Sequence, residues 1–300
     1  MVSRWLLTER ARRYYPCALA LVWQLAGCPL AWGHETGFLN RTLKLNGGYY
    51  RYAVYVPREW TRTRHAKWPV ILFLHGSGEG GSDGLLPTEV GLGTALRNHS
   101  ERFPFIVVFP QIPSEQLWRQ NASARIALAE LDAEIKEFWG DSTRTYLTGL
   151  SMGAYGTWRL AAQFPGRFAA IAPVAGGIRI TWDDGEMRSP DIYSRSAAQI
   201  GTTPVWMFHG SDDKTVPIGD ARAMFEALQR SGGTVRFDEY EGVGHSCWDR
   251  AYSDAEFPLW LLQHRLGERS EAQAQRRVFP RPAAPEPAPV DPTTGVNAPR

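Results

Sequence analysis

The residues best suited to chemistry begin with Ser151, which lies in the segment Gly149-Leu-Ser-Met-Gly153. This G-x-S-x-G pattern separates an apolar run, expected to form a strand, from a helical pattern that begins at Met152. In that position it predicts a tight turn that lifts a serine hydroxyl clear of the backbone as a nucleophile. Such a hydroxyl reacts well only when a neighbouring base accepts its proton, so we looked for a histidine and an orienting carboxylate.

His245 is the best candidate for that base among the seven histidines of the chain. When the serine lies in a turn of this kind, the acid and then the histidine follow it along the chain. His245 comes late enough, and it lies in a loop after a predicted strand at residues 234–240. His75 and His209 each end a predicted strand directly before a glycine, where we expect a packing role.

Two adjacent carboxylates, Asp212 and Asp213, follow a predicted strand at residues 204–208 and lie between the serine and the histidine. The acid of such a site accepts the imidazole N–H and stabilises the imidazolium. The spacing H-G-x-x-D-x-x-V-P favours Asp213, while Asp212 remains the alternative. Asp183 and Asp184, in an earlier insertion, are weaker candidates.

The fourth requirement is a pair of backbone amides that stabilise the oxyanion of the transition state. The residue after the nucleophile, Met152, supplies one amide in sites of this kind. We expect the other from Ser77, in the glycine-rich segment at residues 75–81 that follows an apolar strand. This segment lacks the G-x-G-x-x-G spacing and the Lys-Ser/Thr ending of nucleotide-binding loops, so we expect no nucleotide there.

These residues require a scaffold in which each of them follows a strand. Continuous apolar runs are typical of strands buried on both faces of a parallel sheet. The predicted strands are residues 49–56 (antiparallel), 69–74, 105–109, 145–148, 168–174, 204–208 and 234–240. The predicted helices are residues 124–139 (with Ser123 as the N-cap), 152–164, 217–230 and 255–264. This alternation predicts an α/β fold, a mainly parallel sheet flanked by helices on both faces, with ligands beyond the carboxyl ends of the strands.

Composition excludes several other classes of protein. The chain of 300 residues is 43% hydrophobic and 21% charged, and its formal net charge is +2. These values are those of a soluble globular domain, and so small a positive charge argues against nucleic-acid binding. Three cysteines cannot form a disulfide framework or a cysteine-rich zinc site. We therefore expect no metal and no cofactor.

The two ends of the chain differ from the part between them. Residues 1–33 carry arginines followed by a short apolar run, the layout of an export signal. Residues 25–28 match a lipobox, which would make Cys28 a lipidated N-terminus, and cleavage after Gly33 is the alternative. Residues 268–300 are rich in proline and alanine and are predicted to be a disordered tail. The catalytic domain is predicted to span residues 40–267.

The segments LFLHGSGEGG, YLTGLSMGAYGTW, RFAAIAPVAGG, MFHGSDDKTVP and GHSCWDRAY resemble the α/β-hydrolase superfamily. More narrowly, they resemble exported bacterial enzymes of the phospholipase/carboxylesterase and dienelactone-hydrolase-like type, some of which are described as peptidases. The resemblance covers about residues 49–267. It implies an α/β-hydrolase fold without a cofactor, in which Ser151, Asp213 and His245 form the triad. It also implies that Ser77 and Met152 supply the oxyanion amides.

The substrate is less defined by the sequence. The segment at residues 176–198, where hydrolases carry a cap, is short and polar, unlike the apolar lid of a lipase. We expect small soluble carboxylic esters, with Trp248 as a substrate contact. The alternatives are a serine peptidase acting on short peptides and a non-catalytic hydrolase-fold lipoprotein of the cell envelope. We expect a small-molecule ester as the partner, no nucleic acid, no obligate protein partner, and membrane attachment only through a lipidated Cys28. The expected location is exported: periplasmic, membrane-anchored or secreted.

Overall fold

The computed structural model describes residues 35–61, 67–179, 191–268 and 274–280. The elements below belong to one compact unit, Thr36–Arg300. The predicted export signal with Cys28 and Gly33, and the last twenty residues of the predicted tail (281–300), lie outside the described residues.

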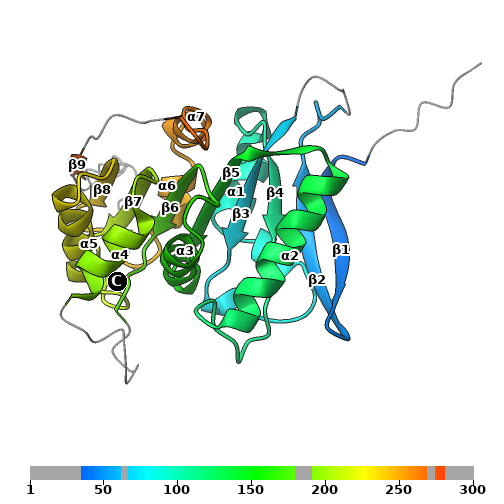
Figure 1. Ribbon diagram of the computed structural model, residues 1–300, viewed down its shortest axis with the longest axis horizontal. Coiled ribbons are helices and arrows are strands. Elements are labelled where there is room, and N and C mark those ends of the chain that lie inside the picture. The colour runs from blue at the N-terminus through cyan, green and yellow to red at the C-terminus, as the bar shows by residue number, and fades with distance from the viewer. Residues whose placement is uncertain (1–34, 62–66, 180–190, 269–273, 281–300) are drawn as a thin grey trace, which may run out of the picture. The chain divides into compact units, whose positions relative to one another are not determined.

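One mixed β-sheet forms the centre of this unit (Figure 1). In the described residues it has nine strands in the order β1-β2-β4-β3-β5-β6-β7-β8-β9. The pairs β1–β2 and β2–β4 are antiparallel, and every other neighbouring pair is parallel. The strands are β1 (Gly37–Leu45), β2 (Gly48–Val56), β3 (Trp68–Leu74), β4 (Ile106–Phe109), β5 (Gly140–Leu150), β6 (Ala170–Val174), β7 (Val205–Gly210), β8 (Val235–Tyr240) and β9 (Ala274–Phe279).

Helices cover both faces of the sheet because successive residues of its strands point to opposite sides. In β3, Val70, Leu72 and Leu74 belong to the buried cluster that includes residues of α2 to α5, whereas Ile71 and Phe73 belong to the cluster that includes residues of α1, α6 and α7. Figure 1 shows α2, α3 and α4 in front of the sheet. The helices are α1 (Leu92–His99), α2 (Asn121–Glu137), α3 (Met152–Gln163), α4 (Ile192–Ile200), α5 (Gly219–Arg230), α6 (Trp248–Tyr252) and α7 (Glu256–Leu262). The predicted fold class is confirmed.

The helix predicted at residues 124–139 begins earlier than expected. Helix α2 starts at Asn121 with Gln120 at the N-cap position, so Ser123 is not the cap. Ser123 is instead buried within the first turn, and its hydroxyl donates to Oε1 of Gln116 at 3.3 Å.

Strand β9 corrects the predicted disordered tail, because it lies within residues 268–300. It pairs parallel with β8, and two of its arginines form ion pairs with acidic residues of that strand. Arg276 lies 2.5 Å from the carboxylate of Glu239, and Arg277 lies 2.5 Å from that of Asp238. Burial raises the pKa of Asp238 to about 6 despite the opposing effect of Arg236. The catalytic unit therefore extends at least to Phe279.

In the described segments, no helix is both long enough and apolar enough to cross a bilayer.

Candidate active site

Ser151 occupies a strained turn between β5 and α3. Its φ is 50° and its ψ is −118°, a conformation that residues with side chains rarely adopt. The neighbouring glycines make this turn sterically feasible. A Cβ at Gly153 would overlap the carbonyl oxygen of Leu74, and a Cβ at Gly149 would lie 2.5 Å from the carbonyl oxygen of Gly153. The G-x-S-x-G spacing is thus required by the close approach of α3 to β3 and β5.

The side chain of His245 reaches Ser151 from the loop between β8 and α6. Its Nε2 lies 2.8 Å from Oγ of Ser151, and its Nδ1 lies 2.7 Å from Oδ2 of Asp213. An ionised carboxylate can only accept a hydrogen bond, so Nδ1 carries the proton. Nε2 is then the acceptor that faces the serine hydroxyl, which is the arrangement needed to remove its proton.

Asp213 is almost fully buried after β7, at 4% exposure. Its Oδ1 accepts the backbone N–H groups of Thr215 and Val216, both at 2.8 Å. Its Oδ2 faces His245 and also lies 3.2 Å from Nε2 of His209. Burial alone would raise the pKa of Asp213, but the hydrogen bonds from His209, Val216 and His245 lower it to about 2. The carboxylate is therefore ionised at any pH near neutrality.

The adjacent Asp212 points elsewhere. It is exposed, and its Oδ1 accepts a hydrogen bond from the hydroxyl of Ser211 at 3.2 Å. The structure therefore brings Asp213, and not Asp212, to His245.

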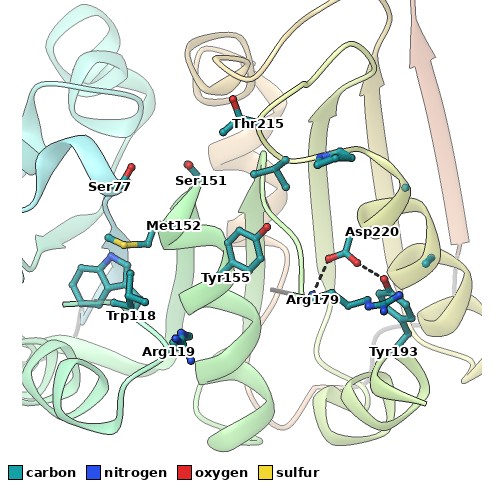
Figure 2. Close-up of a pocket in the computed structure, with 15 residues that line it drawn as sticks. Ser77, Trp118, Arg119, Ser151, Met152, Tyr155, Arg179, Tyr193, Thr215 and Asp220 are labelled. Carbon is teal, nitrogen blue, oxygen red and sulfur yellow. Dashed lines mark hydrogen bonds between the residues drawn. The ribbon is translucent and has the colours of Figure 1, made fainter. Parts of the chain in front are cut away.

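The two expected oxyanion donors line the same cavity as Ser151. Ser77 begins a short 3₁₀ turn (Ser77–Glu79) after β3, and Met152 is the first residue of α3. The amide of a first helical residue has no partner within its helix, so the N–H of Met152 is free of intrahelical bonding. Figure 2 shows Ser77, Ser151 and Met152 at one end of a common cavity.

This cavity has a volume of about 1060 Å³ and a mainly apolar wall. Trp118 closes one side, and it is held there by a hydrogen bond of 2.9 Å from its Nε1 to the carbonyl oxygen of His75. The lining residues are Ser77, Leu117, Trp118, Arg119, Ser151, Met152, Tyr155, Arg179, Tyr193, Thr215, Val216, Pro217, Gly219, Asp220 and Ala223. A ligand in this space would contact the nucleophile and extend over the first turns of α3 and α5.

Asp220, in the first turn of α5, fixes the far wall of the cavity. Its Oδ2 accepts the backbone N–H groups of Ile178 and Arg179 at 2.7 and 2.9 Å. Its Oδ1 accepts the hydroxyl of Tyr193 from α4 (Figure 2). Asp220 thereby connects the segment after β6, α4 and α5. Asp220 belongs to no recognisable motif, so its role could not be predicted from the sequence.

The two histidines that were expected to pack have different surroundings. His75 is buried between the carbonyl oxygen of Gly76 at 2.5 Å and the N–H of Ile112 at 3.2 Å, and burial lowers its pKa to about 4. It packs as expected. Nε2 of His209 lies 2.8 Å from the carbonyl oxygen of Val216. Because it also contacts Asp213, His209 is part of the site as well as of the core.

The expected substrate contact at Trp248 stays a prediction. Trp248 is not among the residues that line the cavity. Its ring instead packs edge-on against the imidazole of His245, with ring centres 5.4 Å apart and an interplanar angle of 89°. Within the described ranges, no group of three or more His, Cys, Asp or Glu side chains is arranged to hold a metal ion.

Comparison with protein families finds a match over more than half of the chain. The Dienelactone hydrolase family matches residues 110–276, a range that contains Ser151, Asp213 and His245. The chain is 27% identical over 233 residues to an "Uncharacterized secreted protein" of Arthroderma benhamiae, which covers 69% of this chain and 24% of that protein. It is 26% identical over 220 residues to a "Poly(3-hydroxyoctanoate) depolymerase" of Pseudomonas fluorescens, with coverages of 66% and 74%.

Among solved structures, the chain is similar to that of a thermostable esterase, with a TM-score of 0.65 and 29% identity. The likeness covers 76% of this chain and 63% of the esterase. The chain thus spans about a quarter of the fungal secreted protein and less than two thirds of the thermostable esterase.

Proposed function

Because the chain belongs to the dienelactone hydrolase family, we propose that it is a serine hydrolase that cleaves carboxylic esters of small soluble molecules. The observation that carries the proposal is the unbroken series of hydrogen bonds from Ser151 through His245 to Asp213, with lengths of 2.8 and 2.7 Å. The series opens into a cavity of about 1060 Å³. The esterase and depolymerase relatives support the ester as the bond that is cleaved.

The proposed reaction has two stages with an acyl-enzyme between them. Oγ of Ser151 attacks the ester carbonyl carbon while Nε2 of His245 accepts the hydroxyl proton. The tetrahedral intermediate then expels the alcohol, which takes the same proton from the imidazolium. A water molecule, deprotonated by His245, next attacks the acyl carbon on Ser151. The second tetrahedral intermediate then expels Oγ of Ser151, which takes the proton back from the imidazolium, and the acid is released. Asp213 holds the imidazole in its reactive tautomer and stabilises its positive charge.

The amides of Ser77 and Met152 are the proposed donors to the oxyanion. Removal of one such donor typically slows the chemical step by about 10²–10³-fold. The N-terminal position of Met152 on α3 also directs the positive end of the helix dipole toward the negative charge.

Small soluble esters are the proposed substrate class. The cavity wall is mainly apolar near Trp118 and Met152, and it carries polar groups at Asp220 and Tyr193. An ester with a short acyl group and a polar alcohol, or the reverse, fits such a wall. A peptidase would use the same three side chains, so only a comparison of ester and peptide substrates distinguishes the two activities.

We also propose export, with residues 1–33 as the signal and residues 281–300 as a tail outside the catalytic unit. One relative is described as a secreted protein. Mass spectrometry of the mature protein from a bacterial host would distinguish an acylated Cys28 from cleavage after Gly33. A mature protein that retains Met1 would contradict export.

The proposed activity is tested by steady-state hydrolysis of p-nitrophenyl acetate, butyrate and octanoate, with peptide p-nitroanilides in parallel. We expect turnover of the short esters, little turnover of the octanoate and none of the anilides. Faster cleavage of the anilides would favour the peptidase, and no turnover of any compound would contradict a hydrolase.

A further inference from the structure

Tyr155 lies one helical turn after Ser151 on the same face of α3. Its backbone N–H points to the carbonyl oxygen of Ser151 at 3.4 Å, and side chains four residues apart on a helix have their Cβ atoms about 5–6 Å apart. Both residues line the cavity. Figure 2 shows the Tyr155 ring between Ser151 on one side and Asp220 and Tyr193 on the other.

The hydroxyl of Tyr155 differs from that of the other tyrosine in the cavity. The hydroxyl of Tyr193 donates to Asp220, so it is already used within the protein. Within the described ranges, the hydroxyl of Tyr155 forms no hydrogen bond to another residue. A half-buried phenol beside a reactive serine therefore presents a donor to the cavity rather than to the protein.

The surroundings of this phenol keep it protonated. Burial raises the pKa of Tyr155 to about 12, and the carboxylates of Asp220 and Asp213 contribute to the rise. Tyr155 is therefore a neutral O–H group over the whole pH range in which such an enzyme works, and it can donate a hydrogen bond to a substrate oxygen.

We infer that Tyr155 determines substrate specificity by donating a hydrogen bond to a second oxygen of the substrate, a few bonds away from the ester that Ser151 attacks. The preferred substrates are then hydroxylated or multiply oxygenated esters rather than plain alkyl esters. This inference rests on the proposed esterase function. It concerns the choice of substrate and assigns Tyr155 no part in bond cleavage.

Three esters of similar size distinguish a role of Tyr155 in substrate specificity from a general effect of Tyr155 on catalysis. Ethyl butyrate has no second oxygen, ethyl 3-hydroxybutyrate has a hydroxyl on the acyl side, and 2-hydroxyethyl butyrate has one on the alcohol side. The Tyr155→Phe variant removes only the phenolic oxygen. We expect kcat/KM to fall about 3- to 10-fold for at least one hydroxylated ester, which is the usual effect of losing one neutral hydrogen bond. For ethyl butyrate the change should stay within about 2-fold.

The Tyr193→Phe variant is the matched control, because it makes the same chemical change in the same cavity at a hydroxyl bound to Asp220. The Tyr193→Phe variant should change kcat/KM by the same factor for all three esters. If Tyr155→Phe also changes all three by a common factor, or changes none, the inference is wrong while the esterase function stands. If the wild-type protein hydrolyses p-nitrophenyl butyrate but none of the three esters, the inference is wrong while the esterase function stands; if it hydrolyses no ester of either kind, the proposed function is contradicted.

Discussion

His209 and Asp213 are in direct contact: Nε2 of His209 lies 3.2 Å from the same Oδ2 atom that receives the imidazole of His245. Both side chains are buried, with exposures of 1% and 4%. The acid of the proposed triad is therefore positioned by a second histidine four residues before it, as well as by the backbone N–H groups of Thr215 and Val216.

The first prediction concerns this second histidine as a positioning residue. His209→Leu removes the ring nitrogen beside Asp213, and we expect kcat to fall about 10-fold, since hydrogen bonds to charged groups contribute about 1.5–3 kcal/mol. His209→Gln keeps an N–H at a similar reach and should recover most of the activity. The pH profile of each variant should also be measured, because loss of the bond raises the pKa of Asp213 and shifts acid inactivation to higher pH. Equal activity of the two variants would argue against a positioning role.

The second prediction separates the two adjacent carboxylates. Asp213→Asn keeps the shape of the side chain but offers His245 the wrong hydrogen-bonding partner, and comparable changes lower kcat by about 10⁴-fold. Asp212→Asn affects an exposed side chain and should change kcat by no more than about 2-fold. Steady-state kinetics on one short ester decides between them. A large loss in the Asp212 variant alone would move the acid by one residue.

The third prediction concerns the cavity wall that Asp220 fixes. A Cβ at Gly177 would overlap the Asp220 carboxylate, so Gly177→Ala must displace the segment after β6. We expect KM for esters to rise about 5-fold or more, with a smaller change in kcat and a lower melting temperature. Gln229→Ala is the control, because it changes an exposed side chain of α5 that does not line the cavity and alanine favours a helix. Similar kinetics for both variants would show that this wall does not shape the cavity.

The fourth prediction concerns the pH dependence of stability. Glu134 is buried and accepts the hydroxyl of Tyr52 at 2.5 Å, and burial raises its pKa from 4.5 to about 7. Burial likewise raises the pKa of the neighbouring Glu130. The folded state thus retains protons that the unfolded chain releases. The contribution of these groups to stability is fully present below about pH 4.5 and is lost as the pH rises through 7.

Glu134→Gln tests this dependence by removing one titrating group. Between pH 5 and 8 the melting temperature of the variant should fall less than that of the wild type, with a difference at pH 8 of at most about 3 kcal/mol in the free energy of unfolding. Glu115→Gln, at an exposed side chain before the same helix, should follow the wild type. Parallel curves for Glu134→Gln and the wild type would refute the assignment.

The sequence was most informative where chemistry and geometry impose a pattern. Every predicted strand and helix is present, because buried strands need continuous apolar runs and Ser151 needs small neighbours at positions 149 and 153. The sequence signal for strand β9 was weaker, because two of its positions carry arginines instead of apolar residues. Arg276 and Arg277 form ion pairs with acidic residues of β8. Strand β1 was missed although its signal was present: Asn46 and Gly47, with φ of 48° and 81°, form the two-residue turn of a β-hairpin.

The residues of the site also divide into those that a local sequence motif predicts and those that no motif predicts. Ser151, Asp213 and His245 belong to local motifs and come together in the structure as predicted from the sequence. Asp220 acts through contacts between segments that are distant along the chain, and it has no local pattern that would reveal it. The ring of Trp248 packs edge-on against the imidazole of His245, and its predicted contact with the substrate stays a prediction.

The most direct test of the central proposal is covalent capture of the nucleophile. The wild-type protein should be incubated with a fluorophosphonate and its peptides analysed by mass spectrometry. We predict a single phosphonylated residue, Ser151, with loss of esterase activity in proportion to labelling. The Ser151→Ala variant should remain folded, take up no label and retain less than about a thousandth of the turnover. Labelling at another residue, or a Ser151→Ala variant that keeps more than about a tenth of the activity, would contradict the account.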